Sequence, residues 1–334
     1  YNRLRSPRRG PDQPEETQVK RREFLVVGGA MAASMALPAR AAFPEKAIRM
    51  IIAFPPGGES DIGARQQQIV FKRLFGQDMV IESKAGAGGA LAWSTLNTYP
   101  GDGYTVMGTN LPHIVLQPLE GNVQYRTEDV TNVHFYQYTP DAIIVRNESP
   151  LKTYADLLKA AKEGQDKVTF AGSTLNSANH VAHTRLNRLM GTKTTYVPFK
   201  GTGDLIASVL GGHVTAAMSY NTLALSQKGK VRMLAVASEK RLAAFPDVPT
   251  FKELGGDWVD GAYRGVGVPK STPEDIRRRI SDIFSEINRD PDFRQKMADG
   301  GFELIDVTYD RMPAFIAERT KAYLEIARMM GLAK

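Results

Sequence analysis

The sequence predicts an α/β protein in which mostly parallel sheets are flanked by helices. Short apolar runs of strand length alternate with amphipathic helical stretches through most of the chain. Such a βαβα order implies parallel strands, with ligands bound beyond their carboxyl ends. A length of 334 residues is enough for two domains with full hydrophobic cores.

The beginning of the chain has the composition of an export signal. Residues 20–22 are basic, residues 24–37 are apolar, and Ala39-Arg40-Ala41 forms a small-x-small cleavage site. The Arg-Arg pair resembles a twin-arginine signal. We therefore expect a periplasmic protein cleaved near Ala41, with a buried N-terminal helix as the alternative. Residues 1–19 are expected to be a disordered or artefactual extension.

Charge and cysteine content exclude several functions. The net charge is +7, but residues 1–41 hold eight Lys or Arg against four Asp or Glu, which leaves +3 for the remainder. The basic excess is therefore poor evidence for nucleic-acid binding, and no nucleic-acid partner is expected. The chain has no cysteine, which excludes thiol catalysis, disulfides and cysteine-based zinc sites.

The segment 50–61 predicts a strand, a turn and a helix start that together could bind an anion. Residues 50–54 form an apolar run, and prolines 55–56 end the strand because neither has an N–H to donate. Glycines 57–58 permit positive φ and close approach of a ligand. Ser60 or Asp61 is expected to cap the helix, so that free N–H groups converge there. An ordinary strand-to-helix turn remains the alternative.

The following helix, residues 61–75, is expected to bury Ile62, Ile69, Val70 and Leu74 and to end at Gly76. The remaining pattern alternates strands and helices. Further strands are expected at 79–82, 104–109, 142–145, 168–171, 195–199, 214–219, 231–237 and 302–307. Further helices are expected to end at about 96, 162, 190, 210 and 287, with a last one beginning at about 311. Residues 245–273 are expected to be mostly irregular, followed by a capping box, Ser271-x-x-Glu274.

The glycine-rich turn 83–90 resembles a dinucleotide fingerprint only superficially. The spacing fails because Leu91 follows Gly86 and Gly88 where a third glycine is needed, and no suitable acidic residue follows. No nucleotide or other cofactor is therefore expected. Close helix–strand packing or a backbone contact to an anion explains this turn better.

Several segments in order are similar to the tripartite tricarboxylate transporter solute-receptor family, also called the Bug family of periplasmic binding proteins. The resemblance covers nearly all of residues 43–334, and the order and spacing of the segments carry it. They are residues 43–49, 56–61, 84–89, 101–105, His180 after a Ser-rich turn, 197–201, 246–250 and 268–273.

The resemblance implies a two-domain, type II periplasmic-binding-protein clamp whose domains are joined by crossover strands. The expected domains are 42–140 plus 264–334 and 141–263, after the leader 1–41. It implies a monomeric receptor, not an enzyme, that captures a small organic carboxylate and delivers it to membrane permease subunits. Alternatives are a receptor for a sensor kinase and, from another class, a twin-arginine-exported cofactor enzyme.

The resemblance also implies where the ligand binds. One wall of the binding cleft is expected at the turn within residues 50–61. The opposite wall is expected at residues 172–177, where Leu175 and Asn176 replace the family's usual glycines. The expected ligand-binding residues are Gly57, Gly58, Ser60, Asp61, Asn110, Ser173, Thr174, Asn176, Ser177, His180 and Asn221.

Catalytic and metal sites find little support in the sequence. His180 and His183 are three residues apart, but no HExxH-like spacing supplies further metal ligands. Gly172-Ser173-Thr174 is not the GxSxG elbow of a serine hydrolase. We therefore expect no metal and no catalytic residues.

Overall fold

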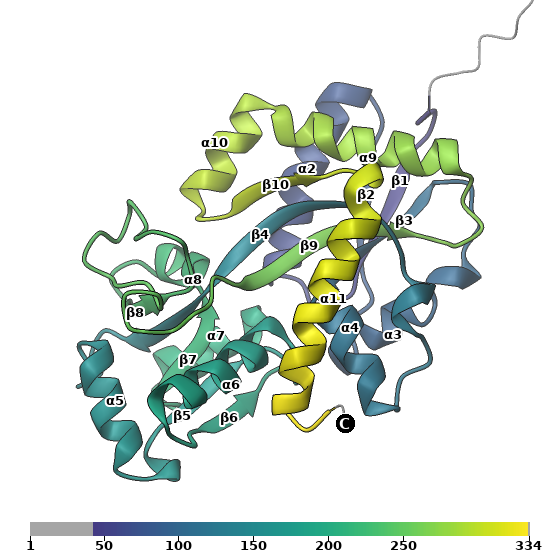
Figure 1. The fold of residues 1–334 in the computed structure, drawn as a ribbon. Coiled ribbons are helices and arrows are strands. Elements are labelled where there is room, and N and C mark those ends of the chain that lie inside the picture. Colours follow the sequence, from purple (N-terminus) through teal and green to yellow (C-terminus); the bar gives the residue numbers. More distant parts are fainter. Residues whose placement is uncertain (1–42, 333–334) are drawn as a thin grey trace, which may run out of the picture. The chain divides into compact units, whose positions relative to one another are not determined.

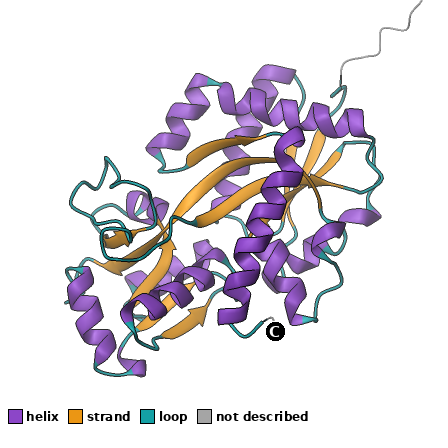
Figure 2. Cartoon of the chain, viewed as in Figure 1, coloured by secondary structure: helices purple, strands orange, loops and turns teal. Residues whose placement is uncertain are grey.

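The computed structural model describes residues 43–332 of the chain, and they form a mixed α/β fold. Ten strands make one curled sheet in the order β2-β1-β3-β9-β4-β7-β5-β6, with β8 and β10 also paired to β4. Helices pack around this sheet (Figure 1, Figure 2). The predicted α/β fold class is confirmed.

One part of the sheet, which we call the first lobe, contains parallel strands joined by helices. Strand β1 pairs in parallel with both β2 and β3. Its strands are β1 (Ile48–Ile52), β2 (Met79–Ser83), β3 (Thr105–Leu111), β10 (Glu303–Val307), β9 and the first part of β4. Its helices are α2 (Glu59–Phe75), α3 (Ala90–Trp93), α4 (His113–Leu116), α9 (Glu274–Arg289), α10 (Pro291–Asp299) and α11 (Met312–Met329).

The other part, the second lobe, repeats the parallel arrangement around β5, which pairs with β6 and β7. Its sheet separates two apolar clusters, one around Phe170 and Phe251 and the other around Leu205 and Val209. Its strands are β5 (Thr169–Gly172), β6 (Thr195–Pro198), β7 (Ala216–Tyr220), β8 (Val231–Val236) and the last part of β4. Its helices are α5 (Tyr154–Lys162), α6 (Ala178–Met190), α7 (Thr202–Leu210) and α8 (Asn221–Ser226).

Two strands connect the lobes: β4 (Thr131–Arg146) and β9 (Gly261–Val268). Strand β4 pairs with β9 as far as Pro140 and with β7 from Asp141 onward. Every antiparallel pair of the sheet involves β4 or β9. The expected crossover strands are therefore these two, and Figure 1 shows them running side by side.

The buried face of α2 differs from the prediction. Val70 is buried as expected, but Ile62, Ile69 and Leu74 are 38%, 59% and 44% exposed. The face against the sheet is instead made of small and polar residues together with one aromatic ring: Ser60, Asp61, Gly63, Ala64, Gln67 and Phe71. A Cβ on Gly63 would lie 2.7 Å from Oε1 of Gln137, so close fit to β4 decides which face is buried.

Other sequence expectations need correction. Strand β4 begins eleven residues before the expected 142, strand β9 lies within the stretch 245–273, and helices α8 and α10 were not predicted. The capping box is absent at α9, because its N-cap is Pro273 and makes no side-chain cap bond. By contrast, Thr153 caps α5 with Asp156 in a capping box, and Gly76 ends α2 at a φ of +68°.

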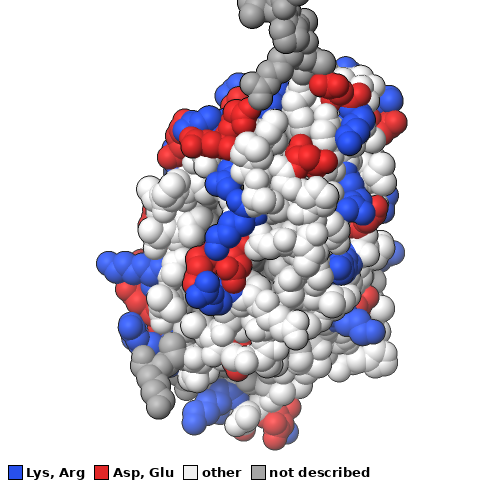
Figure 3. Space-filling view, turned by 90° about the vertical axis from the view of Figure 1, so that its right-hand side faces the viewer, with Lys and Arg blue, Asp and Glu red and all other residues white. Residues whose placement is uncertain are grey.

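The expected export signal and its cleavage site lie outside the described residues. None of the helices within residues 43–332 is both long and apolar enough to cross a membrane. On the face drawn in Figure 3, Lys and Arg are interspersed with Asp and Glu around a wide uncharged centre.

Candidate functional site

Two helix N-termini, one from each lobe, meet beyond the carboxyl ends of β1 and β6. Helix α2 starts at Glu59 and helix α7 starts at Thr202, and the N–H of Glu59 donates to Oγ1 of Thr202 at 3.2 Å. The first N–H groups of a helix have no partner within it, and this end carries the positive end of the helix dipole. The two N-termini therefore present donors and positive potential to the same place, which suits an anion.

Glycines lie on both sides of this contact. A Cβ on Gly203 would lie 3.4 Å from the backbone carbon and oxygen of Gly57, and a Cβ on Gly58 would lie 3.4 Å from Oγ1 of Thr202. Gly57 has a φ of +79°, which favours glycine, whereas Gly58 is extended. Both distances are ordinary van der Waals contacts, so Gly57 is the position at which the backbone itself favours glycine.

A small inner cavity of about 30 Å³ lies at this meeting point. Its walls come from the loops after β1, β3, β5 and β6, together with the ends of β3 and β7 and one residue of β9. The lining residues are Phe54, Pro55, Gly58, Glu59, Ser60, Asn110, His113, Ser173, Gly201, Thr202, Gly203, Asp204, Tyr220 and Arg264.

A buried cation, Arg264, and the Glu59 carboxyl group lie together in the lining of the inner cavity, which also includes Asp204. Arg264 is 3% exposed, and its Nη2 lies 3.6 Å from Oε2 of Glu59. Thr222 of the second lobe donates to Oε1 of Glu59 at 2.5 Å. Burial raises the pKa of Glu59, and the charge of Arg264 opposes that rise. The Glu59 side chain therefore couples α2 to both β9 and α8.

His113 provides a neutral imidazole in the same wall. Burial, together with the charge of Arg264, lowers the pKa of His113 to about 3. Its ring packs edge-on against Phe54 and Trp93, and neither ring nitrogen has a hydrogen-bond partner among residues 43–332. One ring nitrogen of a neutral imidazole can donate and the other can accept, so this side chain offers a polar contact without charge.

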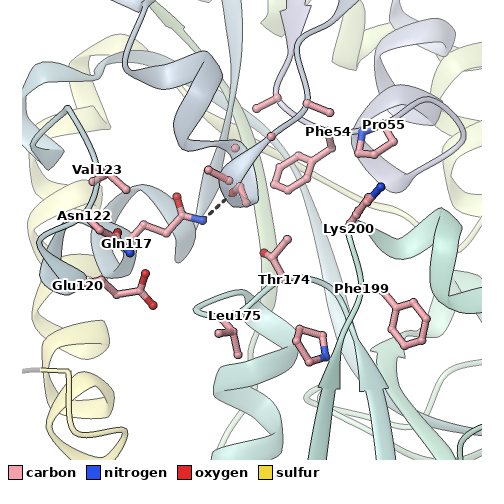
Figure 4. A pocket seen from close by; sticks show the side chains of 17 residues that line it. Phe54, Pro55, Gln117, Glu120, Asn122, Val123, Thr174, Leu175, Phe199 and Lys200 are labelled. Carbon is pink, nitrogen blue, oxygen red and sulfur yellow. Dashed lines mark hydrogen bonds between the residues drawn. The ribbon is translucent and has the colours of Figure 1, made fainter.

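A larger hollow of about 720 Å³, which we call the outer chamber, adjoins the inner cavity and shares Phe54 and Pro55 with it. Figure 4 shows Gln117, Glu120, Asn122 and Val123 on one side, Phe199 and Lys200 on the other, and Phe54 and Thr174 between them. Its other lining residues are Ala53, Pro55, Ala85, Gly86, Ala87, Gly88, Gly89, Leu175 and Pro198.

Comparison with known proteins explains this two-lobed arrangement. The family model described as the tripartite tricarboxylate transporter family receptor matches residues 63–332, most of the chain. The chain belongs to this family. It is accordingly a solute-binding receptor and not an enzyme, and its fold is that of the two-domain clamp.

Relatives and solved structures agree with the family. The receptor is 30% identical over 329 residues to a UPF0065 protein of Cupriavidus necator, covering 95% of this chain and 99% of that one. It is 28% identical to BugT of Bordetella pertussis, covering 90% and 94%. The periplasmic binding protein BugD superposes with a TM-score of 0.80 at 26% identity, covering 87% and 100%. MatC of Rhodopseudomonas palustris, solved with bound malate, superposes with a TM-score of 0.77 at 25% identity, covering 85% of this chain and 99% of MatC.

Four of the predicted ligand-binding residues line the inner cavity of the receptor: Gly58, Ser60, Asn110 and Ser173. Asn110 donates from Nδ2 to Oγ of Ser60 at 3.1 Å, so the Ser60 hydroxyl is free to donate toward the cavity. Ser173 is held by Asn179, whose Oδ1 accepts from both its N–H and its hydroxyl. Thr174, the next residue, lines the outer chamber instead.

Gly57 and Asp61 shape the first wall without lining either cavity. The N–H of Gly57 donates to Oδ2 of Asp61 at 2.9 Å, and Arg65 pairs with the same oxygen at 3.0 Å. The N-cap of α2 is Gly58, so the expected capping by Ser60 or Asp61 is wrong. The Asp61 carboxylate instead reaches back from the first turn and fixes the Pro-Gly loop.

The remaining predicted residues lie outside the linings of both cavities. Ser177 caps α6 by accepting from the N–H of His180 at 3.2 Å. Nδ1 of His180 in turn accepts from the N–H of Asn176, which has a φ of +55° and donates from its side chain to Glu120. Asn221 donates to the carbonyl of Gly301 at 2.8 Å beside a separate hollow. Their expected contact with ligand stays a prediction.

Several site residues were missed by the sequence analysis. Gly201, Thr202 and Gly203 repeat the strand–glycine–helix pattern of the first wall, and this signal could have identified them. Glu59 lies inside the recognised motif but was not selected. Arg264 gave no signal, because its strand was expected to be irregular.

Within residues 43–332, no group of three or more His, Cys, Asp or Glu side chains could hold a metal ion. Nε2 of His183 contacts Oγ1 of Thr194 at 2.9 Å, and burial lowers the pKa of His180 to about 4. These histidines therefore have local structural partners.

Proposed function

We propose that this receptor captures a small organic carboxylate between the N-termini of α2 and α7 and delivers it to a tripartite tricarboxylate-type permease. The observation that carries the proposal is the meeting of Glu59 and Thr202, because it brings the N-terminal turns of both helices, whose first N–H groups have no partner within the helix, to one cavity. A carboxylate accepts several such bonds at once. MatC, which shares the fold, was solved with malate.

Binding at this position explains how the lobes would report on the ligand. Each lobe supplies one helix N-terminus, so an anion between them bonds to both and favours the closed arrangement. The permease would then distinguish the closed, loaded receptor from the open one. The protein acts as a monomer in this proposal, and only the closed surface is recognised.

The proposed domains are residues 42–140 plus 264–334 and residues 141–263. The change of partner on β4, from β9 at Pro140 to β7 at Asp141, supports the first boundary. Strand β9 pairs with the first-lobe part of β4 from Gly261 onward, which supports a return of the chain to the first domain close to residue 264. Export to the periplasm by a twin-arginine-like signal cleaved after Ala41 completes the proposal, and mass spectrometry of the mature N-terminus tests it.

Calorimetry with a panel of mono- and dicarboxylates tests the binding step. We expect a dissociation constant near 1 μM, about 8 kcal/mol, for the preferred acid. Ser60→Ala removes a cavity hydroxyl and leaves Asn110 without its acceptor, so it should weaken binding about fivefold to tenfold. Ser226→Ala in α8, whose hydroxyl bonds only to a local carbonyl, is the matched control. Absence of binding to every organic anion would refute the proposal.

A further inference from the structure

The two cavities differ greatly in size, and this difference constrains the ligand. The inner cavity measures about 30 Å³ and the outer chamber about 720 Å³. One buried water needs roughly 10–15 Å³ on this measure. The inner cavity therefore has room for about two oxygen-sized groups, which is one carboxylate but not the carbon skeleton of an acid.

The skeleton of a bound acid has room to continue into the outer chamber. Phe54 and Pro55 line both spaces, and the chain passes from one to the other between Ser173 and Thr174 and between Gly201 and Lys200. A volume near 720 Å³ falls in the range of about 300–1,000 Å³ that accommodates ligands of drug-like size. A four-carbon acid would leave most of it to water.

The walls of the outer chamber are largely apolar. Among its lining residues only Glu120 and Lys200 carry charge, and Glu120 already accepts a hydrogen bond from Asn176. Leu175 is 49% exposed, although a leucine in this position gains stability when an apolar group covers it. Phe54, Val123 and Phe199 add apolar surface around the same space (Figure 4).

We infer that the ligand is an organic acid whose carboxylate enters the inner cavity and whose bulky apolar body, an aromatic ring or branched hydrocarbon, fills the outer chamber. This inference rests on the proposed carboxylate function and adds the class of acid. Leu175 of the second lobe and Val123 of the first then act as specificity-determining residues of the chamber. Short polar dicarboxylates bind less well because they cover none of this surface.

Calorimetry with four probes tests the inference: 3-phenylpropionate, cyclohexanecarboxylate, butyrate and malate. The first two should bind at least tenfold more tightly than the last two. Equal or tighter binding of butyrate or malate would overturn the inference while leaving the carboxylate function intact. Binding of none of the four, nor of any other acid, would contradict both.

Variants of the lining residues test whether the outer chamber causes the preference for bulky apolar acids. Leu175→Asn should weaken 3-phenylpropionate binding about threefold to tenfold and leave butyrate binding unchanged. Val123→Thr, which keeps the side-chain shape, should act in the same direction more weakly. Leu74→Asn, at a leucine of α2 that is 44% exposed outside the chamber, is the matched control. Equal loss for both acids in the chamber variants would overturn the inference, and unchanged thermal unfolding would show that the variants fold.

Discussion

The backbone N–H of Glu59 donates to the hydroxyl of Thr202 across 143 residues of sequence, at 3.2 Å. One residue begins the helix of the first lobe and the other begins the helix of the second. The bond therefore ties the two lobes together at the point where the inner cavity forms.

Replacing Thr202 tests this connection. Thr202→Val keeps the shape but removes the acceptor, leaving the N–H of Glu59 in a poorly hydrated position, which costs about 1–3 kcal/mol. We expect carboxylate affinity to fall about fivefold to a hundredfold, measured by calorimetry. Thr184→Val, which removes a hydroxyl bonded within α6, should leave affinity unchanged. Unaltered affinity in Thr202→Val would show that the bond does not matter for closure.

A substantial part of the site was predictable from the residues that precede helices. The apolar run, the prolines and the glycines of 50–61 are local signals, and the structure confirms a strand–turn–helix there, with Gly58 and Ser60 in the inner cavity. Local chemistry sets such turns. Which second helix faces this one depends on distant parts of the chain, so α7 was predicted as a helix but its place in the site was missed.

The sequence could not reveal β9 because its glycines contradict strand preference. A Cβ on Gly261 would lie 1.9 Å from the carbonyl oxygen of Thr139, and one on Gly265 would lie 2.5 Å from that of His134. These glycines are present because β4 and β9 approach closely, which is a tertiary cause. Arg264 was therefore hidden in a stretch that resembled a loop. The misassigned face of α2 has the same origin, since Gly63 and Ala64 pack where isoleucine was expected.

The close packing of β9 on β4 predicts a large effect at Gly261. Gly261→Ala forces a backbone shift at the crossing of the lobes, and we expect a loss of more than about 3 kcal/mol in the free energy of unfolding, measured with urea. Gly191→Ala is the comparison, because a Cβ on Gly191 would meet no atom within 4 Å, while its φ of +66° is unfavourable for alanine. Backbone strain alone should therefore cost about 1–2 kcal/mol there. Equal losses of unfolding free energy in the two variants would mean that the crossing of β4 and β9 has room for a methyl group at Gly261.

Acid stability should depend on His113. Its pKa is about 3 in the folded protein because burial and Arg264 disfavour the charged ring, against about 6.5 when unfolded. The stability that comes from keeping His113 neutral is thus complete above pH 6.5. It is lost as the pH falls toward 3, because His113 binds a proton more readily in the unfolded state than in the folded state. His113→Gln should reduce the slope of the unfolding free energy against pH by up to about 1.4 kcal/mol per pH unit between pH 6 and 4.

The control is the difference in unfolding free energy between the wild-type protein and His113→Gln above pH 7.5. There the imidazole is neutral in both states, so any difference should not vary with pH. Urea titrations at half-unit intervals measure both ranges. A variant that kept the full acid slope would place the responsible proton on another group.

The contact between Asn176 and Glu120 predicts a kinetic effect. Asn176 follows β5 in the second lobe, Glu120 follows α4 in the first, and the Asn176 amide donates to the Glu120 carboxylate beside the outer chamber. This partly buried bond contributes about 0.5–1.5 kcal/mol and should act mainly on opening. Asn176→Ala should therefore raise the ligand dissociation rate about twofold to tenfold in stopped-flow measurements, with little change in association. Glu120→Ala should do the same, and the double variant should add nothing further because both changes break one bond. Additive effects would show that each residue acts separately, and the pair would then have no role in holding the lobes together.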